Sequence, residues 1–209
     1  MTAEDEIPER YEFFKDIYRR AEGDSGMVPW ADLAAKATLH EWLVKHPGDG
    51  NMTAIDVACG LGDNAEALAH AGYITSAFDL SPHAVDWARK RFPDSRVHYE
   101  AADLFALPER WMAAFDLVNE CYTLQSMPPE MLDRTAKAVA SLVKPGGTLL
   151  VYARCRDDGA EASGPPWPLE KSRVRVFAGL GFELVSEEFF PVYKPGRQVP
   201  HCFAVWRKS

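Results

Sequence analysis

The sequence lacks several features that would assign it to a specialised class. It has no run of 18 or more apolar residues, so it offers no transmembrane helix. Its four cysteines are scattered and form no C-x-x-C pair, which argues against a zinc site or a redox dithiol and favours reduced thiols. Lys and Arg total 23 against 31 Asp and Glu, and the resulting net charge of −8 disfavours nucleic acid or an anionic membrane as the main partner.

The remaining composition is that of a globular protein. The chain has 209 residues, of which 47% are hydrophobic and 26% charged, enough for one sizeable α/β domain. Residues 1–10 are polar and acidic, unlike a secretory signal, so we expect a cytoplasmic protein. We predict a single domain over residues 1–209, in which residues 1–50 form an N-terminal helical cap and residues 51–209 form the core.

The most informative stretch is residues 54–68. Residues 55–58 read as a short buried strand, Gly60 and Gly62 as a tight turn, and Asn64 as the start of a helix. Glycine can adopt positive φ and lets the backbone approach a ligand closely, and the helix N-terminus offers free N–H groups. Ala65 stands where the G-x-G-x-x-G fingerprint has its third glycine. A dinucleotide, S-adenosylmethionine and simple chain reversal therefore remain open.

Apolar periodicity predicts the other elements. Helices are expected at 8–21, 32–46, 82 to about 93, 130–142 and 169–178, and further strands at 73–80, 97–101, 115–119, 148–153, 183–190 and 201–206, with a sharp stop at 145–147 and a turn region at 191–200. Alternating strands and helices imply a parallel sheet with right-handed crossovers. No helix separates the last two strands, so they should form an antiparallel hairpin.

Six landmarks then follow one another in a specific order. They are Asp56-Val-Ala-Cys-Gly-Leu-Gly-Asp-Asn64, Phe78-Asp-Leu-Ser-Pro82, Ala101-Ala-Asp-Leu104, Phe115-Asp-Leu-Val-Asn-Glu120, Val143-Lys-Pro-Gly-Gly-Thr-Leu-Leu150 and Gly179-Leu-Gly-Phe182. In this order the chain resembles a class I S-adenosylmethionine-dependent methyltransferase from about residue 52 to the C-terminus. Pro29-Trp30, Gln125-Ser-Met-Pro128 and Gly164-Pro-Pro-Trp-Pro-Leu169 resemble the small-molecule, thiopurine-methyltransferase-like members.

The resemblance implies a Rossmann-like α/β fold with seven mostly parallel strands, a C-terminal antiparallel hairpin, helices on both faces and an N-terminal helical lid. It implies S-adenosyl-L-methionine as cofactor, S-adenosyl-L-homocysteine as product, a small-molecule methyl acceptor and no metal. The cofactor residues that it implies are Trp30, Asp56, Ala58, Gly60, Gly62, Asn64, Asp79, Leu80, Asp103, Leu104 and Asn119.

Two of these acids have a physical interpretation of their own. Asp79 ends the second strand, at the sheet edge where α/β folds bind ligands, and its carboxylate can accept both ribose hydroxyls. That role suits NAD equally well, and a helix-capping acid is the structural alternative. Asp103 follows the third strand and could accept from an adenine amino group, with Leu104 supplying a backbone N–H and apolar cover. Its alternative is a solvated loop acid.

The catalytic candidates are Glu120, Tyr18 and His201, each considered as a base that is needed only if the acceptor is protonated. Tyr122, itself a further candidate base, is assigned with Gln125 and Trp167 to the acceptor pocket. Neither an Asp/Asn-Pro-Pro-Tyr/Phe motif nor a Pro-Cys nucleophile occurs after the fourth strand, which points to a small acceptor. We expect transfer by in-line displacement, catalysed mainly by positioning and desolvation.

Other functions stay open on the sequence alone. A NAD(P)-dependent oxidoreductase is opposed by the Pro145-Gly-Gly turn and the terminal hairpin, and a non-catalytic cofactor-binding partner subunit is not excluded. A metal-dependent catechol-type enzyme is disfavoured because no Asp, Asp, Asn cluster can be assembled after the fourth and fifth strands. The acceptor, its reacting atom and the oligomeric state stay undetermined.

Overall fold

The computed structural model describes residues 7–162 and 164–209, so residues 1–6 of the predicted N-terminal cap lie outside it. The chain divides into a first unit, Met1–Leu107, and a second unit, Pro108–Ser209. The elements of the first unit are α1 (Ile7–Ala21), η1 (Ser25–Met27), α2 (Ala37–Lys45), β1 (Thr53–Val57), α3 (Asp63–His70), β2 (Ile74–Asp79), α4 (Pro82–Arg91) and β3 (His98–Ala101). Those of the second unit are η2 (Glu109–Trp111), β4 (Phe115–Cys121), η3 (Leu124–Ser126), η4 (Pro129–Met131), α5 (Leu132–Leu142), β5 (Val143–Arg156), β6 (Leu169–Glu170), η5 (Lys171–Leu180), β7 (Phe182–Lys194) and β8 (Arg197–Lys208).

The first unit holds three parallel strands in the order β3-β2-β1. Helix α3 connects β1 to β2, and α4 connects β2 to β3, as the sequence predicts. Ser81 caps α4 by accepting from the Ala84 N–H, and Pro82 occupies the first turn, where its missing N–H costs nothing. The carboxyl ends of β1 and β2 therefore open onto the starts of α3 and α4.

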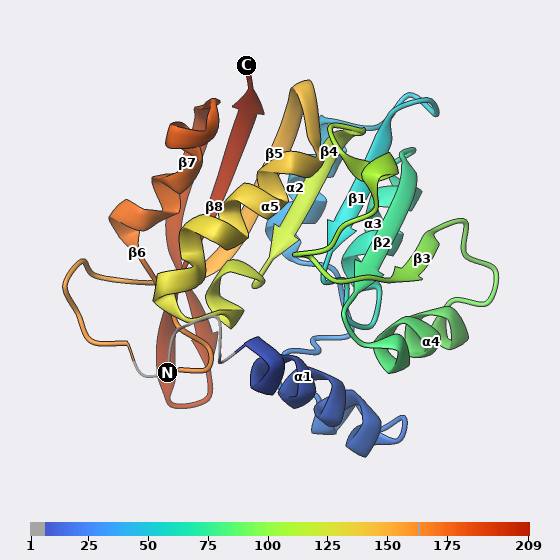
Figure 1. Ribbon diagram of the computed structural model, residues 1–209, viewed down its shortest axis with the longest axis horizontal. Coiled ribbons are helices and arrows are strands. Elements are labelled where there is room, and N and C mark those ends of the chain that lie inside the picture. The colour runs from blue at the N-terminus through green and yellow to red at the C-terminus, as the bar shows by residue number, and fades with distance from the viewer. Residues whose placement is uncertain (1–6, 163) are drawn as a thin grey trace. The chain divides into compact units, whose positions relative to one another are not determined.

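Helix α1 packs within the same unit. Tyr18 and Ala21 on α1 form a buried cluster with Val28, Leu61 and Ala84, and α1 lies beside α4 (Figure 1). Phe14 and Tyr18 on this helix both contact the Trp30 ring edge-on, at centroid distances of 5.6 and 5.8 Å. The side of α1 that carries Phe14 and Tyr18 is thus packed against Trp30.

The second unit pairs its strands in the order β4-β5-β8-β7, with the two-residue β6 on the far end of β5. Strands β4 and β5 are parallel and joined by α5, whereas β8 runs antiparallel to both β5 and β7 (Figure 1). Trp206 and Phe177 anchor its core, with ring centroids 6.0 Å apart. The predicted class, parallel strands alternating with helices and closed by an antiparallel hairpin, is confirmed.

Two of the predicted helices are wrong in extent. The helix expected at 32–46 begins only at Ala37, because Leu33 adopts a positive φ of 53° and the Lys36 N–H donates to Asn64 Oδ1 instead of continuing a helical turn. The helix expected at 169–178 is β6 followed by the 3-10 segment η5. Leu169 pairs with Cys155 of β5, and this pairing delays the helical segment to Lys171.

Strands β5, β7 and β8 also run further than the sequence predicts. Strand β5 begins at Val143 and runs through Pro145-Gly-Gly, where the register jumps from Phe115–Val143 to Leu117–Thr148, so the glycines form a bulge. The turn region expected at 191–200 is mostly strand. Pro191 and Pro200 are paired with each other, so the two residues that lack a backbone N–H interrupt the strand hydrogen bonding at a single position. The hairpin turns at Pro195 and Gly196, the latter with φ of 75°.

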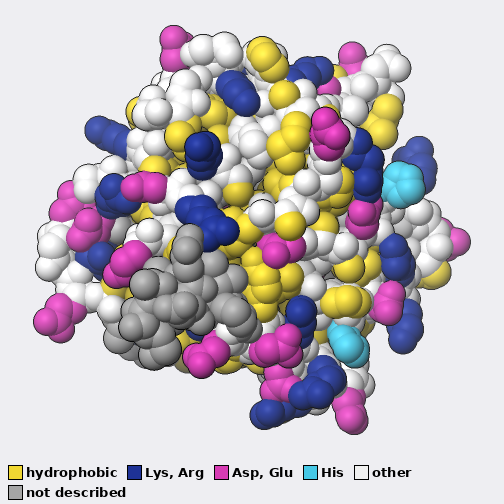
Figure 2. Space-filling model, in the orientation of Figure 1, with side chains coloured by type: hydrophobic (Ala, Val, Ile, Leu, Met, Phe, Trp, Pro, Cys, Tyr) yellow, Lys and Arg dark blue, Asp and Glu magenta, His cyan; other side chains and the backbone are white. Residues whose placement is uncertain are grey.

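Charges of both signs are interspersed over the face drawn in Figure 2, and no single-sign stripe crosses it. In the part of the chain that the structure describes, no helix is long and apolar enough to cross a bilayer.

Candidate active site

The glycine turn and Asp79 form one hydrogen-bonded unit. Gly60 and Gly62 adopt φ of 53° and 89°, and Ala58 before them also has a positive φ of 51°. The Asp79 carboxylate accepts from the Gly60 N–H through Oδ2 and from the Ser81 N–H through Oδ1, both at 2.9 Å. Asp79, at the end of β2, thus binds both the turn after β1 and the start of α4. It lies where the sequence predicts a ligand-binding acid, and it also has the capping role given as the structural alternative.

Asp79 is electrostatically unusual. Its side chain is 6% exposed, and burial raises its pKa from the ordinary 3.8 to about 6, although the N–H groups of Ser81 and Gly60 oppose the rise. A buried carboxylate at the carboxyl ends of parallel strands is suited to accept hydrogen bonds from a diol. We therefore regard Asp79 as the anchor of the site in the first unit.

Tyr18 and Trp30 cover the turn. Trp30 Nε1 donates to Tyr18 Oη at 2.7 Å, and Tyr18 is buried. A methyl group added at Gly60 would lie 3.0 Å from Tyr18 Oη, so the phenol lies directly against the glycine backbone. Burial, with the nearby Asp79 charge, raises the pKa of Tyr18 well above its ordinary value, so its hydroxyl keeps its proton. Tyr18 can therefore donate a hydrogen bond, and its predicted role as a base stays a prediction.

Asp103 is engaged by the N-terminal helix. Tyr11 Oη donates to Asp103 Oδ1 at 2.5 Å, and the Phe105 N–H donates to the same oxygen at 2.8 Å. The predicted solvated-loop alternative therefore does not describe Asp103, whose carboxylate is ordered by α1. Leu104 beside it is buried.

The remaining predicted cofactor residues of the first unit surround the same turn. Asp56 is buried within β1, Ala58 is exposed at the end of that strand, and Leu80 is partly buried after β2. Asn64 lies in the first turn of α3, where its side chain accepts from the Lys36 backbone. These placements agree with a ligand site at the carboxyl ends of β1 and β2.

Sequence reasoning missed two residues that support the turn. Arg91 makes a bidentate ion pair with Asp63, at 2.7 and 2.8 Å, and donates to the Leu61 carbonyl at 2.6 Å. Tyr99 packs under Gly62, where an added methyl group would lie 2.5 Å from its hydroxyl. In the sequence, Arg91 is marked only as one of the basic residues in the last turn of α4. Tyr99 is marked only by its position in a predicted strand.

In the second unit, Asn119 and Glu120 both lie inside β4, because the strand continues to Cys121, beyond its predicted end at residue 119. Both are buried. Glu120 Oε1 accepts from the Thr123 and Leu124 N–H groups at 2.6 and 3.0 Å, which fixes the start of η3. This geometry makes Glu120 a structural anchor of the loop after β4, and its predicted role as a base stays a prediction.

Tyr122 and His201 lie side by side. Tyr122 Oη is 2.9 Å from His201 Nε2, and His201 Nδ1 is 2.8 Å from the Val199 carbonyl oxygen. Their positions follow from strand register, since the Tyr122 N–H donates to the Tyr152 carbonyl and His201 pairs with Arg154. The structure therefore joins a predicted pocket residue and a predicted base at the carboxyl end of β4.

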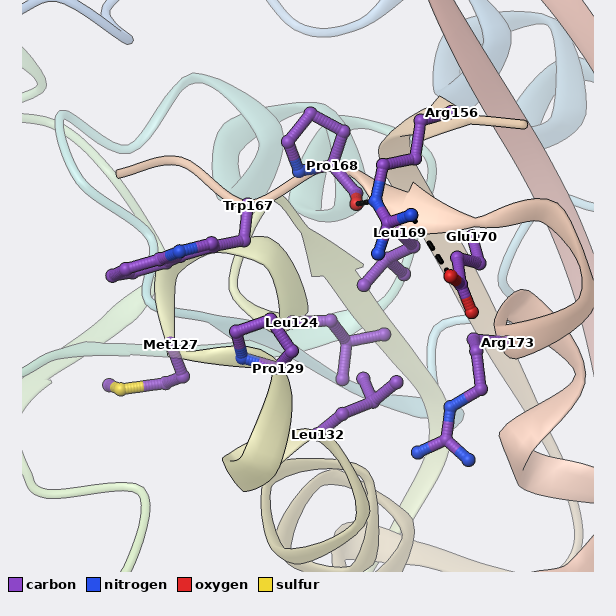
Figure 3. Close-up of a pocket in the computed structure, with 10 residues that line it drawn as sticks. All are labelled: Leu124, Met127, Pro129, Leu132, Arg156, Trp167, Pro168, Leu169, Glu170 and Arg173. Atoms are coloured by element: carbon purple, nitrogen blue, oxygen red, sulfur yellow. Dashed lines mark hydrogen bonds and ion pairs between the residues drawn. The ribbon is translucent and has the colours of Figure 1, made fainter. Parts of the chain in front are cut away.

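Gln125 and Trp167 are joined by their backbones. The Trp167 N–H donates to the Gln125 carbonyl at 2.8 Å, and the buried Gln125 side chain accepts from the Arg154 N–H at 2.5 Å. Trp167 walls a pocket whose floor is Leu124, Leu132 and Leu169 (Figure 3). The opposite end carries Arg156, which bonds Glu170 and the Pro168 carbonyl, together with Arg173 (Figure 3).

Within residues 7–162 and 164–209, no three His, Cys, Asp or Glu side chains gather as a metal ion would require.

Comparison with known proteins agrees with these features. Residues 54–147 match the family model described as a methyltransferase domain. Ubiquinone biosynthesis O-methyltransferase of Xanthomonas campestris pv. campestris (strain B100) is 34% identical over 110 residues, which are 52% of this chain and 45% of that protein. The chain thus spans about half the length of this curated relative.

Two further proteins are similar along most of the chain. Thiocyanate methyltransferase 1 of Brassica oleracea is 27% identical over 192 residues, covering 88% of this chain and 82% of that protein. The structure of Burkholderia thailandensis 1,6-didemethyltoxoflavin-N1-methyltransferase, with bound 1,6-didemethyltoxoflavin and S-adenosylhomocysteine, aligns with a TM-score of 0.76 at 17% identity over 100% of this chain and 91% of that one. Residues 54–147 therefore match a methyltransferase domain, and the chain has the Rossmann-like fold of the solved methyltransferases, which confirms the resemblance.

Proposed function

We propose that this chain is an S-adenosylmethionine-dependent methyltransferase that moves a methyl group to an O, S or N atom of a small molecule by in-line displacement. The observation that carries the proposal is the buried Asp79 carboxylate, bonded to the Gly60 N–H under the Tyr18–Trp30 cover. We further propose that residues 1–209 act as one methyltransferase domain, located in the cytoplasm, with no nucleic acid or membrane as partner.

The residues of the first unit fit such a cofactor. The Gly60 and Gly62 backbone leaves no room for side chains on its inner face, because Tyr18 and Tyr99 occupy it, and Ala58 is exposed beside it. Asp79 would hold the ribose hydroxyls and Asp103 the adenine amino group. Asp56 and Asn64 would order the turn near the methionine end, and Tyr18 would donate a hydrogen bond.

The second unit holds the residues predicted to bind the acceptor. When bound, S-adenosylmethionine offers an electrophilic methyl group on a sulfonium, whose charge is lost as the methyl is transferred. We keep Asn119 of β4 as a cofactor residue, as the resemblance implies, while Tyr122, Gln125 and Trp167 would orient the acceptor. The apolar floor of the Trp167 pocket favours a partly apolar acceptor and excludes water from it.

The test is calorimetric titration of the purified protein with S-adenosylmethionine and S-adenosylhomocysteine, with NAD and NADP in parallel. We expect micromolar binding of the two sulfur compounds and loss of that binding in Asp79→Ala. Binding of NAD instead would support the oxidoreductase alternative, and binding of neither would favour a non-catalytic partner subunit. A positive result justifies a screen of thiols, phenols and amines as acceptors.

A further inference from the structure

In the hydrogen bond between Tyr122 and His201, the donor and the acceptor can be assigned. The Val199 carbonyl can only accept a hydrogen bond, so the His201 Nδ1 that lies 2.8 Å from it carries the proton. In the neutral imidazole, Nε2 then has the lone pair, and the Tyr122 hydroxyl donates to it at 2.9 Å. The ring nitrogen is thus set to take a proton from the phenol.

The two residues of this pair differ in their exposure to solvent. His201 is 1% exposed, and its ring contacts Tyr152 and Phe190 at centroid distances of 5.3 and 6.2 Å. Tyr122, by contrast, is only partly buried. Among the residues that the structure describes, Tyr152 of β5 packs its ring against both members of the pair, and Arg154 of the same strand lies over the Tyr122 ring.

Two further features single out Tyr122. Its φ of 71° is rare for a bulky residue, and such strained conformations gather at functional sites. The Arg154 guanidinium carbon lies 5.7 Å from its ring centroid, and a cation there favours negative charge on the phenol. The fold therefore holds a strained tyrosine between a cation and a buried proton acceptor.

We propose, resting on the methyltransferase function above, that Tyr122 backed by His201 accepts the proton of the methyl acceptor, so that the natural acceptor arrives as a neutral O–H or N–H group. The acceptor's X–H bond breaks as its proton passes to Tyr122 Oη, whose own proton passes to His201 Nε2. The electron pair left on X forms the bond to the methyl carbon, and the carbon–sulfur pair returns to sulfur as a neutral thioether. The Nε2 proton of His201 afterwards returns to Tyr122 Oη, and the hydroxyl proton of Tyr122 passes to water.

The test uses two probe acceptors with the full-length protein: 4-methylphenol, which is neutral at pH 7, and thiophenol, which is largely ionised there. Tyr122→Phe keeps the ring and removes the hydroxyl. It should lower kcat with 4-methylphenol by about 100-fold or more, the usual size of general-base catalysis, and with thiophenol by less than about threefold. Its deficit should shrink as the pH approaches about 10, where a phenol ionises unaided.

A second variant separates proton transfer from a structural hydrogen bond. The His201→Gln side chain can accept from Tyr122 but cannot hold a proton at pH 7, so a structural role would survive the change and the proposed role would not. We expect the same selective loss on 4-methylphenol, with an unchanged dissociation constant for S-adenosylhomocysteine. Tyr193→Phe is the matched control, because Tyr193 is 72% exposed on β7, and its kcat should not change.

Several results would overturn the proposal. Equal losses on both probes, a normal rate for Tyr122→Phe on 4-methylphenol, or retained activity in His201→Gln would each do so. Methylation of neither probe by a protein that binds S-adenosylhomocysteine would overturn this proposal alone. Failure of the wild-type chain to bind S-adenosylhomocysteine would instead overturn the methyltransferase function on which it rests.

Discussion

Asp79 links burial, hydrogen bonding and ligand chemistry in one side chain. Its carboxylate accepts two backbone N–H groups but is so buried that its pKa rises to about 6. In the unfolded chain the pKa returns to about 3.8. The folded state therefore holds this proton more tightly, and the stability that Asp79 contributes is fully present below the unfolded pKa and is lost as the pH rises through about 6.

Cofactor binding should have the opposite dependence on pH. A ribose diol donates hydrogen bonds, so the ionised Asp79 is the better partner. With a pKa of about 6, about nine tenths of Asp79 is ionised at pH 7 and about one tenth at pH 5. We therefore expect S-adenosylhomocysteine to bind about tenfold more weakly at pH 5 than at pH 7, as measured by calorimetry.

The control for this prediction is Asp79→Asn, which cannot titrate. Its affinity should be low and nearly the same at the two pH values. A wild-type affinity that does not change between pH 5 and pH 7, or an asparagine variant with the same pH dependence as the wild type, would show that another group is responsible.

Single residues were predicted from the sequence where a motif marks them. Asp79 and the two turn glycines are marked by strand–turn–helix spacing, and the structure places them together. The contacts of Asp103 with Tyr11 and of Tyr122 with His201 join residues 92 and 79 positions apart. No local pattern marks such partners, since they depend on how separate elements pack.

At the scale of elements, the glycine turn allows crowding and backbone strain to be measured separately. Gly62 and Gly50 have nearly equal φ, 89° and 86°, but an added methyl group at Gly62 would lie 2.5 Å from Tyr99 Oη, whereas at Gly50 it would meet nothing within 4 Å. Gly50→Ala should cost about 1 kcal/mol for the strained backbone. Gly62→Ala should cost about 1–3 kcal/mol more, because overpacking is added.

Urea unfolding of the two variants measures the difference. Tyr99→Phe removes the crowding hydroxyl, so a double-mutant cycle with Gly62→Ala should give a favourable interaction energy, even though Tyr99→Phe alone loses a hydrogen bond to Glu66. Equal free energies of unfolding for Gly62→Ala and Gly50→Ala would contradict the crowding argument.

The loop after β5 gives a second prediction at this scale. The Trp167 backbone N–H, not its side chain, ties this loop to Gln125, so Trp167→Ala should leave the loop in place and remove only the wall of the pocket. We expect a higher KM for the acceptor found by screening, with little change in the cofactor Kd. Steady-state kinetics and calorimetry measure the two quantities.

Trp42→Ala is the control, because Trp42 stacks on His46 at 4.3 Å in the first unit and lines no part of this pocket. It should leave the KM unchanged. A Trp167→Ala variant that lost cofactor affinity as much as acceptor affinity would reduce this tryptophan to a packing residue.

Helices and strands were predicted well where a local pattern of residues determines them. They were predicted poorly where contacts with a distant part of the chain determine the conformation. Helix α4 begins at Pro82, as the Ser81-Pro82 pair indicates. Residues 191–200 carry turn-type residues and yet extend the hairpin, because pairing with the opposite strand outweighs local preference. Residues 32–36 fail as a helix for a similar reason, since Asn64 binds the Lys36 N–H from another element.

At the scale of the whole molecule, the charge distribution bears on metal dependence. The carboxyl end of β5 carries Arg154 and Arg156, and Arg154 lies over the Tyr122 ring at the end of β4. One oxygen of the Glu120 carboxylate, also in β4, already accepts from two backbone N–H groups. Positive charge beside the acceptor position repels a divalent cation and suits an anionic intermediate instead.

We therefore expect methyl transfer without added metal. The rate should be the same in EDTA as in millimolar Mg²⁺, measured as S-adenosylhomocysteine release with the acceptor found by screening. Arg154→Gln removes the cation and should slow transfer to a phenol, because the developing phenolate loses its neighbour, and added Mg²⁺ should not restore the rate. A rate that disappears in EDTA and returns with Mg²⁺ would place a metal at the acceptor and contradict this electrostatic role of Arg154.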